Sequence, residues 1–349
     1  MTAPAPVAER PAGQPEEGGR KRRFNEGTGR LAATLLSPTM LVLGLVVLYP
    51  ILAALRESLY TSGTRIDPSG FVVKGSEFVG LDNYSAIFKG DTADRFWNAF
   101  YNTTFFTVTC VILETVLGVA MALIMHKAFK GRAVVRASIL VPWAIPTVVS
   151  ALLWKWIFQA DGVANSILGT QVLWSTEGWQ SKASVILADT WKTAPFIGLL
   201  VLAGLQTIPA EVYEAAKVDG ASALQQFRRI TLPLVKPALL VAVLFRILDT
   251  LRIFDLPFVL VGAHKDSVET MSMLAYDEAF NTRFGPAAAY ATVLFIYVAV
   301  VAFAFVKLLG ADVIGEARAK RPGGKAKKRE VEAAPGVPIG AGAAGGGGF

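Results

Sequence analysis

Two segments of this chain, residues 31–55 and 284–306, contain no lysine, arginine, aspartate or glutamate. About 20 consecutive apolar residues form a helix that is long enough to cross the hydrocarbon core of a bilayer. Hydrophobic residues make up 53% of the chain, well above the balance of a water-soluble domain. The sequence therefore predicts an all-α integral membrane protein with six transmembrane helices, the other four being residues 99–125, 137–158, 183–207 and 238–262.

Lysine and arginine are unevenly distributed on the two sides of these spans. With the N-terminus in the cytoplasm, 22 of the 34 lie in cytoplasmic segments and eight in external ones. Cytoplasmic loops of membrane proteins are enriched in these residues. We therefore expect a multi-pass protein with both termini and loop 126–136 in the cytoplasm, and with 57–96, 159–182 and 263–283 outside. The net charge of +7 then reflects orientation in the membrane and not nucleic-acid binding.

The chain divides into one transmembrane domain, about 30–310, and two tails. Residues 1–29 and 311–349 are rich in Ala, Gly, Pro and charged residues, a composition typical of disorder. Cys110 is the single cysteine, so no intrachain disulfide can form. The sequence contains no phosphate-binding P-loop motif, no Ser-His-Asp set and no cluster with metal-ligand spacing. It therefore predicts no catalytic residues, metal or cofactor of this chain's own, so any energy source must come from another chain.

The polar segment 208–237 separates the fourth and fifth predicted spans. Pro209 suits the first turn of a helix, and Gly220 suits the left-handed residue that follows a helix end. Ser222 can cap a second helix, which Pro233 and Pro237 should end. We expect two short amphipathic helices, which need a partner surface because alone they bury too little apolar area.

This segment resembles the coupling-helix signature of permease subunits of binding-protein-dependent ABC importers. The resemblance implies a type I importer core that works with a second permease subunit and an extracellular sugar-binding lipoprotein. It also implies a cytoplasmic ATPase dimer, which would bind ATP and magnesium outside this chain. The positions that match the signature and would contact the ATPase are Glu214, Ala215, Ala216, Asp219, Gly220, Ile230, Leu232 and Pro233.

Three further stretches resemble carbohydrate-uptake permeases of the maltose and trehalose type, including the A-type trehalose permeases of mycobacteria. They are FVGLDNYSAIFKG, WKTAPF and LFRILDTLRIFDLPFVL, and with the coupling motif the resemblance covers about residues 31–310. It implies import of trehalose or a related α-glucoside across a bacterial plasma membrane. The chain lacks the large external insertion that the maltose permease carries before its fourth span, because only 159–182 connect there.

Eight charged residues lie inside the predicted spans, where each costs about 2.5–3.5 kcal/mol on insertion scales. Three pairs are spaced as neighbours on a helix surface: Asp189 with Lys192, Arg246 with Asp249, and Arg252 with Asp255. Two readings remain open, a substrate site and ion pairs that only pack the helices. Glu114 is interpreted as a packing hydrogen-bond acceptor.

Two prolines support a site at the depth of these charges. Pro195 and Pro257 each remove a helical N–H, which frees the carbonyls of Trp191 and Ile253. Freed backbone in a membrane is tolerated only when it is buried in protein or lines a wet cavity. Broken helices that meet near the midplane are typical of transporter substrate sites.

The resemblance to the maltose permease implicates the same region. Sugar hydroxyls would be bound by charged and hydroxyl side chains, and Phe196 could stack on a pyranose face. The positions that align with its sugar contacts are Asp189, Lys192, Thr193, Phe196, Arg246, Asp249, Thr250, Ile253 and Asp255. Several residue types differ from the maltose case, which leaves the identity of the sugar open.

Three alternative functions remain at this stage. A permease for another solute, such as glycerol phosphate, would use Lys192 and Arg246 as unpaired cations. An ion-coupled secondary transporter would explain the buried charges but not the coupling motif. A membrane scaffold without transport would leave the polar residues at the midplane unexplained.

Overall fold

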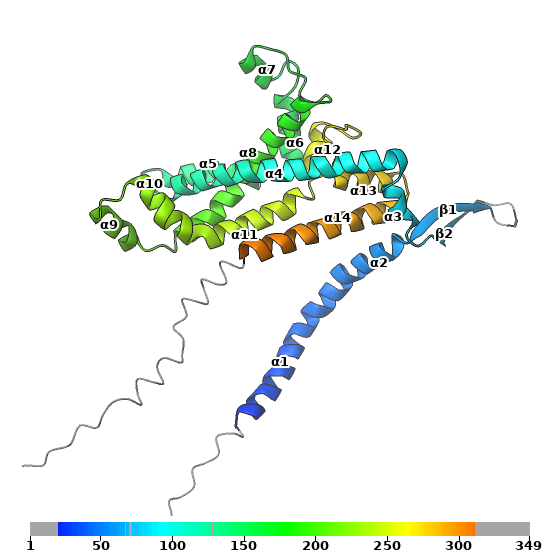
Figure 1. Ribbon diagram of the computed structural model, residues 1–349, viewed down its shortest axis with the longest axis horizontal. Coiled ribbons are helices and arrows are strands. Elements are labelled where there is room, and N and C mark those ends of the chain that lie inside the picture. Colours follow the sequence, from blue (N-terminus) through cyan, green and yellow to red (C-terminus); the bar gives the residue numbers. More distant parts are fainter. Residues whose placement is uncertain (1–19, 67, 70–71, 128, 311–349) are drawn as a thin grey trace, which may run out of the picture.

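The computed structural model describes residues 20–310 apart from 67, 70–71 and 128, and it is mostly helical (Figure 1). Four long helices form the bundle: α4 (Gly90–His126), α8 (Trp179–Leu205), α11 (Leu232–Thr250) and α14 (Phe284–Phe305). The N-terminal helices α1 (Arg20–Leu43) and α2 (Tyr49–Glu57) are joined by a π-helical turn over Gly44–Leu48. Helix α2 contacts α14 at the hairpin end, and α1 runs away from the bundle. The predicted helical membrane fold is confirmed.

In the described part of the chain, five helices are long and apolar enough to cross a membrane. A sixth crossing is possible through α5 (Arg132–Ala144) and α6 (Thr147–Ile157), which are bent against each other by 96°. Pro146 lies at the break and the peptide backbone of Ile145 is extended there, because the residue before a proline avoids the helical region. The third predicted span, 137–158, is therefore a broken helix and not a straight one.

The helices α4 and α8 approach each other closely. A Cβ atom on Gly118 would lie 2.7 Å from Ile197 Cβ and 2.9 Å from the Ala194 carbonyl, so the glycine allows the two backbones to approach. In α8, 72% of the most apolar window is buried, compared with 0% in the N-terminal span. This helix is therefore the central element against which the others are arranged.

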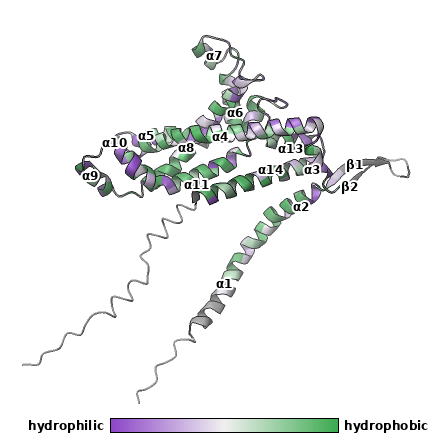
Figure 2. Cartoon of the chain, viewed as in Figure 1, coloured by the Kyte–Doolittle hydropathy of each residue, from purple (hydrophilic) through white to green (hydrophobic). Residues whose placement is uncertain are grey.

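Hydrophilic residues gather at the two ends of the bundle, and apolar residues cover its middle (Figure 2). One end carries α9 (Ala210–Val218) and α10 (Ala223–Gln226). The opposite end carries α3 (Asp82–Ile87), α13 (Met271–Phe280) and a two-stranded antiparallel hairpin. This distribution matches two water-exposed faces on either side of an apolar layer.

The hairpin of β1 (Tyr60–Ile66) and β2 (Val72–Phe78) was not predicted from the sequence. Its register pairs Tyr60 with Phe78 and Ile66 with Val72. The amide of Asn83 donates hydrogen bonds of 2.8 Å to the carbonyls of Ser58 and Tyr60, which ties the start of the hairpin to α3. A search for membrane-length apolar runs cannot detect such an element, because the strands are short and mixed in polarity.

Two predicted boundaries are wrong. The first helix begins at Arg20, so residues 20–29 are helical instead of part of a disordered tail. The fifth span ends at Thr250 and not at 262. The next helix is α12 (Asp255–Leu260), and Pro257 lies in its first turn. Pro195, in contrast, interrupts nothing, because α8 continues through it. The tails expected at 1–19 and 311–349 lie outside the described residues.

The polar segment after α8 contains the two predicted helices, but the second helix does not end where the sequence predicted. Pro209 precedes the first turn of α9, and Gly220 follows it with a φ of +76°. Ser222 forms a capping box with Gln225 at the start of α10. The second helix does not stop at Pro233, because a π-helical turn over Phe227–Thr231 carries it into α11. A π-turn shifts hydrogen bonds by one residue, which lets the helix accommodate the missing N–H.

Candidate functional site: a polar cleft between broken helices

Arg246 on α11 is the centre of a buried ionic cluster. Its Nε donates to Glu114 Oε2 at 2.5 Å, and its Nη2 donates to Glu114 Oε1 at 2.9 Å. Nη2 also donates to Asp189 Oδ2 at 2.6 Å, and Nη1 donates to Asp249 Oδ2 at 2.5 Å. Glu114 belongs to α4 and Asp189 to α8, so one guanidinium connects three helices of the bundle.

Two neighbours in α8 extend this cluster. The hydroxyl of Thr193 lies 2.5 Å from Glu114 Oε1 and 2.5 Å from the backbone carbonyl of Asp189. The Lys192 ammonium donates to the carbonyl of Ile145 at 2.8 Å. Ile145 is the residue at the break between α5 and α6, so Lys192 satisfies a carbonyl at the point where the helix is interrupted.

A second interruption lies between α11 and α12. The carbonyl of Ile253, predicted to lose its helical donor to Pro257, accepts a 2.9 Å hydrogen bond from the Thr270 hydroxyl. Thr147 at the start of α6 and Phe254 at the start of α12 line the same hollow. Two broken helices therefore meet at one cleft. They are α5–α6 and α11–α12, whereas the prolines of the sequence had indicated breaks in the fourth and fifth spans.

The cleft consists of two adjoining hollows of about 400 and 260 Å³, which share Trp143, Arg246, Asp249 and further lining residues. Every residue that the resemblance placed in a sugar site lines one or both of them. These nine residues are Asp189, Lys192, Thr193, Phe196, Arg246, Asp249, Thr250, Ile253 and Asp255. The structure thus brings the whole predicted set together, while their role in binding stays a prediction.

Of the predicted ion pairs, only Arg246 with Asp249 is present as expected. Asp189 pairs with Arg246 and not with Lys192. The Nε of Arg252 donates to the Leu248 carbonyl at 3.0 Å, in place of the expected contact with Asp255. The reason is that α11 ends at Thr250, before both residues, so the three-residue helical spacing on which the prediction rested does not exist there.

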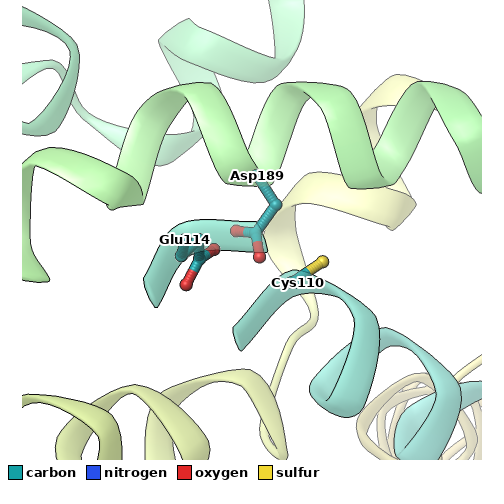
Figure 3. A group of neighbouring side chains, drawn as sticks. All are labelled: Cys110, Glu114 and Asp189. Carbon is teal, nitrogen blue, oxygen red and sulfur yellow. The ribbon is translucent and has the colours of Figure 1, made fainter. Parts of the chain in front are cut away.

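Cys110, Glu114 and Asp189 lie together where α4 faces α8 (Figure 3). Their potential ligand atoms all lie within 4.8 Å of one another, and all three residues are buried. The guanidinium of Arg246 donates to both carboxylates, however, and supplies the positive charge that a cation would otherwise bring. We therefore assign the group to the ionic cluster and not to a metal site.

The cleft is also lined by four aromatic or hydroxyl residues that were not predicted as site residues from the sequence: Trp143, Thr147, Phe245 and Phe254. A signal was available in the short spacing from Trp143 to Pro146, since a proline that breaks a span exposes the preceding turn. The phenylalanines are indistinguishable by sequence from the lipid-facing ones on the same helices.

The predicted ATPase-coupling residues lie at the far end of the bundle from the hairpin (Figure 1). Glu214, Ala215, Asp219 and Gly220 are exposed, and Ala216 is buried. Two large apolar side chains of the same segment also face outward, Val218 at 88% and Leu224 at 62% exposure. Ile230 is half-buried, and Leu232 and Pro233 are exposed at the start of α11.

Comparison with known proteins gives the family. Residues 114–315 match the model of the binding-protein-dependent transport system inner membrane component. The chain is 37% identical to the trehalose/maltose transport system permease protein of Thermococcus litoralis over 284 residues, which are 80% of this chain and 92% of that protein. It is 38% identical to the trehalose transport system permease protein of Mycobacterium tuberculosis over 289 residues, 82% of this chain and 91% of that one.

A solved structure has the same fold. The bacterial ABC transporter that imports the acidic polysaccharide alginate aligns with a TM-score of 0.67 at 22% identity, covering 83% of this chain and 98% of the other. The matched family segment includes the ionic cluster, the cleft residues and α9–α10. The predicted family is confirmed: this chain belongs to the inner membrane components of binding-protein-dependent transport systems, the permease subunits of ABC importers.

Proposed function

We propose that the cleft around Arg246 is the sugar-binding site of an ABC importer for trehalose or a related α-glucoside. The observation that carries the proposal is the side-by-side arrangement of an ionic cluster and aromatic rings in one cleft. Such a pairing suits a pyranose, which offers hydroxyls at its edge and an apolar C–H face. Two similar proteins that carry trehalose in their names support this substrate class.

The aromatic side of the cleft is formed by Trp143 and Phe196. Their ring centroids are 5.9 Å apart, with an interplanar angle of 31°. Phe245 lines the same hollow. Large aromatic faces supply apolar contact area at a small entropic cost, and their quadrupole attracts the C–H groups of a sugar ring.

The polar side has one carboxylate that is free to change partners. Asp249 is 69% exposed, whereas Arg246 is 3% exposed and keeps Glu114 and Asp189 whether or not Asp249 remains bound. Asp249 can therefore turn to two sugar hydroxyls without leaving an uncompensated buried charge. Glu114 and Asp189 hold the guanidinium in place, and Arg246 presents it at the floor of the cleft.

A phosphate-bearing solute fits this arrangement poorly. Such a ligand would require Lys192 and Arg246 as free cations. Arg246 instead binds three carboxylates, and Lys192 donates to the Ile145 carbonyl. A neutral, hydroxyl-rich solute needs only partners that can donate and accept hydrogen bonds, which the cleft supplies.

We further propose that a second permease subunit completes the pathway, that an extracellular sugar-binding lipoprotein delivers the substrate, and that an ATPase dimer supplies the energy. The exposed Val218 and Leu224 on α9–α10 support the ATPase contact, since two short helices with outward apolar side chains require a covering surface. Both termini would lie in the cytoplasm of a bacterial plasma membrane. ATP and magnesium would be bound by the ATPase subunits.

Replacement of Asp249 by asparagine tests the site. An amide offers one acceptor in place of two, and a lost charged hydrogen bond is worth about 1.5–3 kcal/mol, or roughly tenfold to a hundredfold in affinity. Uptake of radiolabelled trehalose by the complex should fall accordingly while complex yield stays unchanged. The matched control is Asp161→Asn, the same change at an exposed carboxylate outside the cleft.

Normal uptake at normal yield in Asp249→Asn would remove Asp249 from the site. A collapse in complex yield would show that the residue is structural. Thr250→Val is a companion variant: its hydroxyl donates to the Arg246 carbonyl at 2.8 Å and is almost fully buried. We expect it to have a smaller effect on uptake than the Asp249 change.

A further inference from the structure

Four aromatic residues form a continuous row at the end of the bundle that carries α13 and the hairpin. Phe254 and Phe258 stack with centroids 5.0 Å apart, and Tyr276 and Phe280 stack at 5.9 Å. Tyr276 bridges the two pairs, with its ring 4.9 Å from Phe254 and 5.2 Å from Phe258. Each pair is spaced by four residues, so each presents its rings on one side of its segment.

The row connects the central cleft to a second hollow. Phe254 lines the cleft next to Asp255 and Ile253. Phe258, Tyr276 and Phe280 line the second hollow, which lies further toward the α13 end. A ligand that leaves one hollow for the other along this row would therefore keep an aromatic face beside it.

The far end of the row is open, and the mostly apolar hollow beside it also carries polar side chains. Phe280 is 74% exposed and Tyr276 is 41% exposed. The same hollow is lined by Arg95, His264 and Asp277, side chains that can donate or accept hydrogen bonds at the edge of a ring. An apolar lipid chain would use the aromatic faces but not these groups, whereas a sugar ring would use both.

The polar groups are held in fixed positions. Arg95 on α4 donates to Glu269 at 2.6 and 2.9 Å and to Asp277 Oδ2 at 3.0 Å. Its Nη2 also lies 3.5 Å from His264 Nδ1. These contacts join α4, α13 and the segment between α12 and α13, so the aromatic row has a firm support on one side.

We propose that Phe258, Tyr276 and Phe280, with Arg95 and Asp277 beside them, form an outer subsite that binds a pyranose ring before it enters the central cleft. The inference rests on the proposed function, since it assumes that the imported solute is a sugar. Stacking on successive rings would let the sugar advance toward Phe254 without losing all of its contacts at once. The subsite would also bind neutral sugars of different linkage, because stacking on an aromatic ring depends little on the positions of the sugar hydroxyls.

The test compares Tyr276→Leu and Phe280→Leu with Phe284→Leu. Each change keeps an apolar side chain and removes a ring, and Phe284 is an exposed phenylalanine at the same end of the bundle that does not line the hollow. The complete transporter, reconstituted with its partner subunits, is assayed for uptake of radiolabelled trehalose. Binding of the same sugar to the full chain in lipid nanodiscs is measured in parallel, in the wild type and with Asp249→Asn present.

The two subsite variants should lower sugar uptake about threefold to tenfold, the equivalent of one aromatic contact, with unchanged complex yield. Phe284→Leu should transport like the wild type. Weak trehalose binding should persist in Asp249→Asn and disappear when Phe280→Leu is added. Unchanged uptake in both subsite variants overturns the subsite, as does a loss of complex yield, which would assign the row to a subunit or lipid contact. Failure of the wild-type complex to transport or bind trehalose would instead overturn the proposed function.

Discussion

Glu114 and Arg246 are 132 residues apart in the sequence and form a two-pronged ion pair inside the bundle, with N–O distances of 2.5 and 2.9 Å. Glu114 is fully buried, and Arg246 is almost so. A carboxylate and a guanidinium match each other in shape, which makes this contact directional as well as strong. The pair holds the floor of the cleft in place while Asp249, on the other side of the guanidinium, faces the open space.

Glu114→Gln should damage assembly more than it damages substrate recognition. The amide keeps the size of the side chain but removes the negative charge, and breaking a buried ion pair typically costs about 3–5 kcal/mol. We expect a clear drop in the thermal unfolding temperature of the purified chain and in complex yield. Residual complex should transport trehalose with near-normal concentration dependence. Wild-type stability in this variant would contradict a structural role for Glu114.

Gly118→Ala should destabilise the contact between α4 and α8. The added Cβ would lie under 3.0 Å from both Ile197 Cβ and the Ala194 carbonyl, so one backbone must shift. Overpacking of this kind costs on the order of 1–3 kcal/mol. The matched control is Gly44→Ala, where the added atom meets nothing within 4 Å. The thermal unfolding temperatures of the two variants are compared. Equal temperatures would mean that the close approach of α4 and α8 does not contribute to stability.

Gly220→Val should uncouple the α9–α10 segment from ATP hydrolysis. Gly220 has a φ of +76°, and a β-branched residue in the left-handed region is strained by about 1–3 kcal/mol. Gly220→Asn is the control, because asparagine tolerates this conformation. Assembly with the ATPase, or sugar-stimulated ATP hydrolysis, should fall only in the valine variant. Equal activity of the two variants would refute the role of Gly220 in shaping the coupling turn.

Ser69 and Ser222 should be reachable from opposite sides of the membrane. Ser69 lies at the tip of the hairpin and Ser222 caps α10, at the two polar ends of the bundle. Single cysteines at these positions, in a Cys110→Ala background, are treated with a membrane-impermeant thiol reagent in intact cells. Only the cysteine at 69 should be labelled before the cells are broken. Labelling of both from outside would refute an orientation with cytoplasmic termini.

The family, the helical membrane fold and the polar break at 208–237 could all be predicted without coordinates. Each depends on information that is local in the chain: the length of an apolar run, the φ preference of Gly220, the cap at Ser222. Such features are decided within one or two helical turns, so the order of residues is enough to show them. The resemblance to other permeases predicted nine site residues, and all nine line the cleft in the structure.

Partner choice inside the bundle required the folded structure. The sequence paired Asp189 with Lys192 and Arg252 with Asp255 by helical spacing, but Asp189 binds Arg246 across a helix interface, and α11 ends before Asp255. Likewise Pro146 breaks a span while Pro195 and Pro233 do not. Arg246 has three carboxylates within reach, and the geometry of the packed helices decides which of them it binds. A proline is tolerated in a helix wherever the neighbouring turns can rearrange. Both outcomes depend on how helices distant in sequence pack against one another, which no local pattern encodes.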